Sequence, residues 1–174
     1  DRLENIIKIA SRVEELAVTK AGADIRWLSF HTHPTTHKKY LSPMGNGLYS
    51  GIAGVGLFYL SLFKVSQTPH YLTCADRVLH SLAESFGYFK SDSSVSAFHG
   101  LGSYIYLLLS RQQITGDQKY NDTLEDLLTR IIEVPPKDYD FDFLSGCCGA
   151  VTLMANVYVL NPREDLLSAI RRMV

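Results

Sequence analysis

The residues best suited to chemistry stand just before glycines that head long apolar segments. Asp142 lies four residues before Gly146, and His99 directly precedes Gly100. A carboxylate at a helix start is stabilised by the helix dipole whether or not it reacts, and a histidine there is often neutral and bonded to backbone. Asp142 is therefore either an N-terminal cap or an acid–base group, and His99 is a candidate for lining a pocket.

Aromatic side chains accompany the same glycines. Tyr49, Phe98 and Phe143 each lie shortly before a glycine of the pattern. We expect them to form an aromatic collar where the apolar helices begin, as pocket-lining candidates. Packing at a core or rim accounts for them without a ligand.

The glycines themselves need a reason, because a glycine inside a helix costs about 1 kcal/mol relative to alanine. In the stretch "NGLYSGIAGVGLFYL", residues 46–60, Gly51, Gly54 and Gly56 head an otherwise apolar helix. A phosphate-binding loop is one explanation, and close packing of helix ends is the other. Close packing is favoured, since neither a Walker lysine nor a preceding strand accompanies the glycines.

The chain contains cysteines and histidines, which can bind metals, but their spacing does not match that of a structural metal site. Cys147 and Cys148 are adjacent, whereas structural zinc sites prefer cysteines two to four residues apart, so we expect small core residues. The segment "HTHPTTHKK" carries three histidines, and its proline and threonines predict a solvated loop. Those histidines are His31, His33 and His37. The sequence thus predicts no metal bound by this chain.

The glycine segments are copies of one repeat. Aligned on the first glycine, they read Gly51-Ile-Ala-Gly54, Gly100-Leu-Gly-Ser103 and Gly146-Cys-Cys-Gly149. They recur at intervals of about 45 to 50 residues, a period that holds two helices and two connections. An apolar segment follows each glycine, and an amphipathic segment such as "DQKYNDTLEDLLTRIIEV" follows that. No segment alternates with period two for long enough to predict a strand.

These patterns predict an all-α fold: a leading helix, "LENIIKIASRVEELAV", and about three helix pairs. The first helix of each pair is apolar all round and must be inner, and the amphipathic second helix must be outer. Inner helices enclosed by outer ones describe a partial α/α toroid, with a solenoid of helix pairs as the alternative. We expect one domain over 1–174, with a leading helix and connector at 1–45 and repeats at 46–96, 97–141 and 142–174.

Composition argues against nucleic-acid-binding, membrane-spanning and disulfide-rich proteins. The net charge of −1 excludes a basic footprint for nucleic acid. The apolar runs are shorter than the roughly 20 residues that a membrane helix needs, and we expect no signal peptide, since no basic region and apolar block precede the first helix. Three cysteines form no disulfide framework, which favours the cytoplasm. The chain starts and stops inside amphipathic patterns, as a part of a longer protein would.

The three copies "LYSGIAGVGLF", "FHGLGSYIYLL" and "DFLSGCCGAVTL" resemble the glycine motifs of the lanthionine synthetase C-like (LanC-like) cyclases. The flanking "WLSF" and "YLSPMGNGLYSG" are most similar to the cyclase domain of type 2 lanthipeptide synthetases (LanM). The resemblance runs from about the first helix to the end of the chain. It covers the amino-terminal half of such a domain.

The resemblance implies an α/α toroid that adds cysteine thiols of a precursor peptide to dehydroalanine or dehydrobutyrine, in lantibiotic biosynthesis. It also implies a zinc ion that activates the thiol, a dehydratase domain as a partner, and an acid–base role for Asp142 in the third motif. The family's zinc ligands lie in Trp-Cys-x-Gly and Cys-His-Gly motifs, which this chain lacks. We therefore expect the fragment alone to hold no zinc and to be inactive.

Two other functions stay open at this point. A carbohydrate-active α/α barrel would need two carboxylates at its mouth, and only Asp142 is placed for this. A non-catalytic module could hold an extended peptide in an apolar groove. An open flank on the first and last inner helices would also favour self-association of the isolated chain.

Overall fold

A computed structural model describes residues 2–19, 24–88, 95–133 and 141–174. Helix α1 (Arg2–Glu15) leads, and six helices follow in consecutive pairs. The pairs are α2 (Ile52–Ser66) with α3 (Pro69–Tyr88), α4 (Leu101–Thr115) with α5 (Asn121–Glu133), and α6 (Cys147–Leu160) with α7 (Glu164–Met173). Among the described residues, no helix is both long and apolar enough to cross a bilayer.

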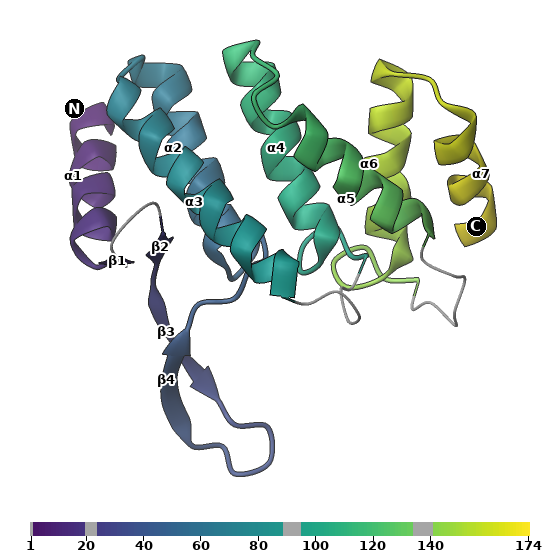
Figure 1. Cartoon of the computed structure of the whole chain (residues 1–174). Coiled ribbons are helices and arrows are strands. Elements are labelled where there is room, and N and C mark those ends of the chain that lie inside the picture. The colour runs from purple at the N-terminus through teal and green to yellow at the C-terminus, as the bar shows by residue number, and fades with distance from the viewer. Residues whose placement is uncertain (1, 20–23, 89–94, 134–140) are drawn as a thin grey trace.

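The pairs stand side by side in chain order (Figure 1). Helix α2 contacts α4, and α4 contacts α6, so the first helices of the pairs form a continuous inner layer. Helix α5 buries one stripe at helical spacing, Leu124, Leu127, Leu128 and Ile131, whereas α4 is buried over most of its circumference and exposes Tyr106. The predicted all-α fold, a partial α/α toroid with a leading helix and three pairs, is confirmed.

The expectation that the chain contains no strands is wrong. Strand β1 (Val18–Thr19) pairs with β2 (Ile25–Arg26), and β3 (Leu28–Thr32) pairs antiparallel with β4 (Lys39–Pro43). The β3–β4 hairpin projects away from the helices (Figure 1). Seven of its ten strand residues are exposed and none is buried. Since neither face is buried, no period-two hydrophobic pattern marks it.

The hairpin also corrects the loop expected at "HTHPTTHKK". His31 lies in β3 opposite Tyr40, and their rings stack with centroids 5.7 Å apart. His33 and His37 lie in the connection between the strands, where the backbone N–H of His37 donates to the His33 carbonyl (2.9 Å). The histidines are thus spread over the hairpin, and His31 belongs to a strand.

The glycines of the first repeat lie where backbone segments approach closely. A Cβ atom on Gly51 would stand 2.4 Å from the Gly45 carbonyl oxygen, and one on Gly54 would stand 2.3 Å from that of Leu48. The N–H groups of Ile52 and Gly54 donate to the carbonyls of Gly45 and Gly47. A phosphate would need those N–H groups, so this geometry fits close packing and not an anion cradle.

An ion cluster around the buried Arg111 links α3 to the last turns of α4 and to the residues that follow α4. Arg111 is only 3% exposed, and its Nε lies 2.6 Å from Asp76 Oδ1. Its guanidinium also pairs with Asp117, while Lys119 Nζ lies 2.8 Å from Asp76 Oδ2. A buried charge is tolerated only when it is paired in this way.

Candidate functional site

A cavity of about 400 Å³ lies where the three inner helices begin. The expected aromatic collar lines it: Tyr49, Phe98 and Phe143 come from the turns before α2, α4 and α6. The rings of Phe98 and Phe143 are tilted, with centroids 5.9 Å apart. Tyr49 is 78% exposed and Phe143 is 49% exposed. Large apolar surface left open around a cavity is typical of a binding site.

Hydrogen bonds between neighbouring repeats hold these turns together. The Leu48 N–H donates to the Phe98 carbonyl (2.8 Å). The Ser96 hydroxyl donates to the Leu144 carbonyl (2.8 Å). Phe98 and Leu144 occupy the same position, two residues before the motif glycine. The repeat therefore fixes the mouth of the cavity through matching contacts.

Asp142 caps the turn before α6. Its Oδ2 accepts a hydrogen bond from the Ser145 N–H (2.5 Å), and its carbonyl accepts one from Gly146. The hydrogen bond from Ser145 is the main reason that the pKa of Asp142 lies below its usual value. Asp142 is exposed and is therefore a carboxylate at neutral pH, next to Phe143 of the cavity wall.

Ser96 has the same role one repeat earlier. Its hydroxyl accepts the His99 N–H (3.0 Å), as Asp142 accepts that of Ser145. In the first repeat Gly47 stands at this position, and a Cβ there would lie 2.5 Å from the Phe98 carbonyl oxygen. The chain thus has three different residues at this position, Gly47, Ser96 and Asp142, and only Asp142 is charged.

His99 is exposed on the turn before α4, beside Gly47, but it does not belong to the lining of the cavity. The glycines Gly100 and Gly146 begin α4 and α6 with extended backbone, as Gly51 begins α2. A Cβ on Gly149 would stand 2.2 Å from the Phe143 carbonyl oxygen, so this glycine lets α6 approach the turn that carries Phe143.

Sequence reasoning missed three polar residues of the cavity. Tyr106 of α4 and Thr152 and Asn156 of α6 line it together with the collar. Thr152 and Asn156 are four residues apart and face the same side of α6, and the Asn156 amide donates to the Thr152 carbonyl (3.0 Å). Polar residues at this spacing in an otherwise apolar inner helix were the available signal.

The described residues contain two groups of three potential metal ligands, and both lie outside the cavity lining. The groups are Glu14, His70 and Cys74, and Asp24, His80 and Glu84. Burial, and then the neighbouring Glu14, raise the pKa of the Cys74 thiol to about 11.

The adjacent cysteines of α6 belong to neither group. Cys147 is buried, and its sulfur lies 3.9 Å from the Met173 carbonyl oxygen. Cys148 is half-buried beside it. Both thiols are free, and both lie at the start of α6.

Comparison with known proteins agrees with the glycine repeat and the inner layer. No curated protein matches the chain. A family model described as "Lanthionine synthetase C-like protein" matches residues 42–174. This match begins at the end of β4 and covers all three helix pairs, which is well over half of the chain. The chain belongs to the lanthionine synthetase C-like family.

Proposed function

We propose that this chain forms part of a lanthionine synthetase cyclase domain and supplies one wall of its peptide site. The proposal rests on the cavity, because the turns of all three repeats converge on it. The family match supplies the chemistry that such a cavity could serve. Its lining is mainly apolar, with Tyr106, Thr152 and Asn156 as polar groups. Such a lining suits a peptide segment that carries a cysteine and a dehydrated residue.

Ring closure needs a proton to move. The cysteine thiol loses its proton, sulfur bonds to the β-carbon of dehydroalanine or dehydrobutyrine, and the π electron pair moves toward the carbonyl to give an enolate. The α-carbon then takes up one proton, so the proton lost by sulfur balances the proton gained by carbon. A carboxylate beside the peptide can carry this proton from one atom to the other.

We assign this role to Asp142. Its lowered pKa keeps it ionised, so it begins the cycle as a proton acceptor and not as a donor. The backbone N–H groups of the next three residues of the turn hold it in place, and its side chain is exposed, where a substrate can reach it. His99, Tyr49, Phe98 and Phe143 line or flank the path to this carboxylate in the proposal.

The zinc ion of the family does not fit residues of this chain. Neither ligand motif of the family occurs in the sequence, and neither group of potential ligands in the described residues lines the cavity. No step of ring closure is therefore assigned to a metal here. The proposal gives this chain peptide contacts and proton transfer, and leaves thiol activation to the remainder of the toroid.

Other parts of the proposal follow from the LanM resemblance. We propose repeats at 46–96, 97–141 and 142–174 within one domain over 1–174, a dehydratase domain as partner, and a lanthipeptide precursor as substrate. Three free cysteines support a cytoplasmic location. The chain alone is proposed to be inactive in ring closure. The carbohydrate-active alternative loses its support, because the family match accounts for the helix pairs without it.

The test uses Asp142→Ser in the complete cyclase domain, with a synthetic peptide that carries one cysteine and one dehydroalanine. Serine already caps the equivalent turn at Ser96, so this variant keeps the fold and removes the carboxylate. We expect ring closure to slow by about 10²–10⁴-fold, the usual contribution of acid–base catalysis. Thiol alkylation followed by mass spectrometry would show open peptide.

Asp126→Asn is the matched control, because Asp126 is an exposed carboxylate on outer helix α5. It should close rings at the wild-type rate. If Asp142→Ser also closes rings at that rate, Asp142 is only a cap of the turn. The domain would then still bind peptide, and the function closest to the geometry would be the non-catalytic peptide module.

A further inference from the structure

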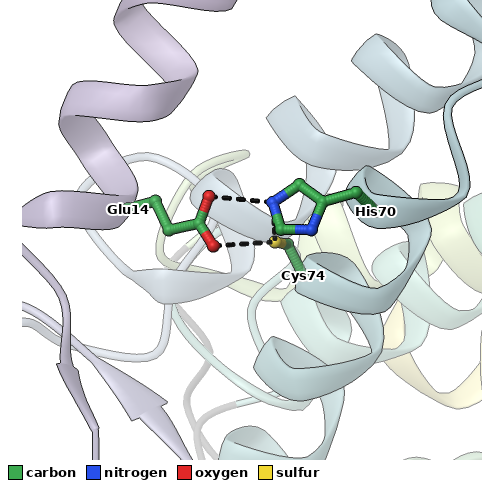
Figure 2. A group of neighbouring side chains, drawn as sticks. All are labelled: Glu14, His70 and Cys74. Carbon is green, nitrogen blue, oxygen red and sulfur yellow. Dashed lines mark hydrogen bonds and ion pairs between the residues drawn. The ribbon is translucent and has the colours of Figure 1, made fainter.

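Three side chains from two distant segments meet on the side of α3 that faces α1 (Figure 2). The Nε2 atom of His70 lies 2.9 Å from Oε2 of Glu14, and Sγ of Cys74 lies 3.9 Å from Oε1 of Glu14. The sulfur of Cys74 is 3.7 Å from His70 Nε2. His70 and Cys74 share one face of α3 because they are four residues apart. Carboxylate, imidazole and thiol thus converge on one point.

These separations are within about half an ångström of the edges of a tetrahedral zinc site. Zinc bonds of about 2.3 Å to sulfur, 2.05 Å to nitrogen and 2.1 Å to oxygen, at tetrahedral angles, separate the ligands by about 3.6 Å (S–N), 3.6 Å (S–O) and 3.4 Å (N–O). The sulfur–nitrogen distance of 3.7 Å already agrees. Glu14 now offers one oxygen to each partner, Oε2 to His70 Nε2 (2.9 Å) and Oε1 to Cys74 Sγ (3.9 Å). Rotation of its flexible side chain has to bring a single oxygen near both when an ion binds.

The chemistry of the three ligands selects the class of metal. Thiolate and imidazole favour zinc or cobalt over magnesium, calcium or manganese. Two anionic ligands, Glu14 and the Cys74 thiolate, balance the charge of a divalent ion. The thiol proton passes to solvent when the metal binds.

Access to the site is also suitable. Cys74 forms the buried base of the site and is 1% exposed, while the side chains of His70 and Glu14 are 54% and 36% exposed. An ion can therefore enter from solvent and keep a water as its fourth ligand. Three protein ligands with one open position is a common zinc arrangement.

We propose that Glu14, His70 and Cys74 bind one zinc ion, which fastens the leading helix α1 to the first outer helix α3. Helix α1 lies outside residues 42–174 of the family match. It is otherwise tied by side-chain hydrogen bonds to its backbone carbonyls, such as those from the Tyr59 hydroxyl to Ala10 (3.4 Å) and from the Trp27 indole to Val13 (2.7 Å). The ion would replace a single Glu14–His70 pair with a rigid link.

The second group in the described residues, Asp24, His80 and Glu84, is the weaker candidate. It offers no sulfur. Asp24 is already engaged, because its Oδ1 accepts the Ser81 hydroxyl (3.1 Å) and its Oδ2 lies 3.9 Å from Arg26. A metal there would have to displace these partners.

The test loads the 174-residue chain with cobalt(II) or zinc(II) after chelation and dialysis. We expect one ion per chain, with thiolate-to-cobalt charge-transfer absorption in the near ultraviolet. Cys74→Ser and His70→Gln should weaken binding by at least about tenfold and remove or shift that absorption. Chelation should lower the melting temperature of the wild-type chain and leave that of Cys74→Ser unchanged.

Two matched controls identify the site. Cys148→Ser removes another thiol, and His80→Gln removes an equally exposed histidine of the same helix. Both should keep one ion per chain with unchanged affinity. The proposal is overturned if wild-type chain holds no stoichiometric ion, if Cys74→Ser binds as wild type does, or if either control loses the ion. Since none of these readouts uses ring closure, their failure is separate from that of the proposed function.

Discussion

Replacing Gly54 with alanine distinguishes two physical effects of opposite sign. Helix propensity alone predicts that alanine stabilises α2 by at most about 1 kcal/mol. In the structure, the new Cβ would stand 2.3 Å from the Leu48 carbonyl oxygen, whereas ordinary contact begins at 3.4 Å. The atom it meets is backbone, so the turn that carries Tyr49 has to move. Overpacking of this kind costs about 3 kcal/mol at the upper end of its range.

The net effect of Gly54→Ala is therefore a loss of about 2 kcal/mol in the free energy of unfolding. With a urea dependence of about 2 kcal/mol per molar, the unfolding midpoint should fall by about 1 M. Urea titration followed by far-ultraviolet circular dichroism measures this midpoint. Gly45→Ala is the matched control, since nothing lies within 4 Å of its Cβ, and its midpoint should barely change. A Gly54→Ala midpoint equal to or above that of wild type would refute the close-packing explanation of the motif glycines.

The remaining predictions concern pH and association. Hydrogen bonding to Arg111 lowers the pKa of Asp117 below its ordinary value of 3.8. As pH falls, the unfolded chain therefore protonates at Asp117 before the folded chain does. The contribution of the Asp117 carboxylate to stability is present above its ordinary pKa and is lost as pH falls through its lower pKa in the folded chain. Urea midpoints measured against pH should fall less steeply there in Asp117→Asn, and an identical slope would contradict the ion-pair account. Val159 and Leu160 of α6 are 78% and 73% exposed, so we expect the isolated chain to self-associate at micromolar concentration. Sedimentation should show species above 19.5 kDa that Val159→Glu shifts toward monomer, and a single wild-type monomer would contradict this.

The helix pairs could be predicted from sequence because burial imposes their pattern. Inner helices such as α4 are buried over most of their circumference, and outer helices such as α5 bury one stripe, so apolar periodicity predicts which helix is inner and which is outer. The β3–β4 hairpin could not be predicted in this way. Its residues Phe30 and Tyr40 are exposed, and an exposed strand is free of the alternation that a core would impose.

Some residues of the site could be predicted from the sequence because they lie close to the motif glycines. Phe98 and Phe143 lie within a few residues of a motif glycine, so the repeat itself brings them to the cavity, and Asp142 follows as the neighbour of Phe143 just outside the lining. Glu14 and His70 are 56 residues apart, and their meeting depends on how α1 lies against α3. No spacing rule reports such a contact, so the metal candidate appeared only in three dimensions.

Filling the cavity tests the central claim most directly. Thr152 is exposed on α6, lines the cavity, and donates its hydroxyl to the Cys148 carbonyl (2.9 Å). Thr129 of outer helix α5 is equally exposed and donates to the Glu125 carbonyl over the same distance (2.9 Å). Tryptophan at either position therefore makes the same change, but only Thr152→Trp fills the cavity.

The measurement is the rate of ring closure in the complete cyclase domain, with a synthetic peptide that carries one cysteine and one dehydroalanine. Thr152→Trp should lose most of its activity while it unfolds at the wild-type urea midpoint, and Thr129→Trp should close rings as wild type does. Normal ring closure by folded Thr152→Trp would show that the peptide reacts elsewhere, and would contradict the assignment of this cavity to the cyclisation site.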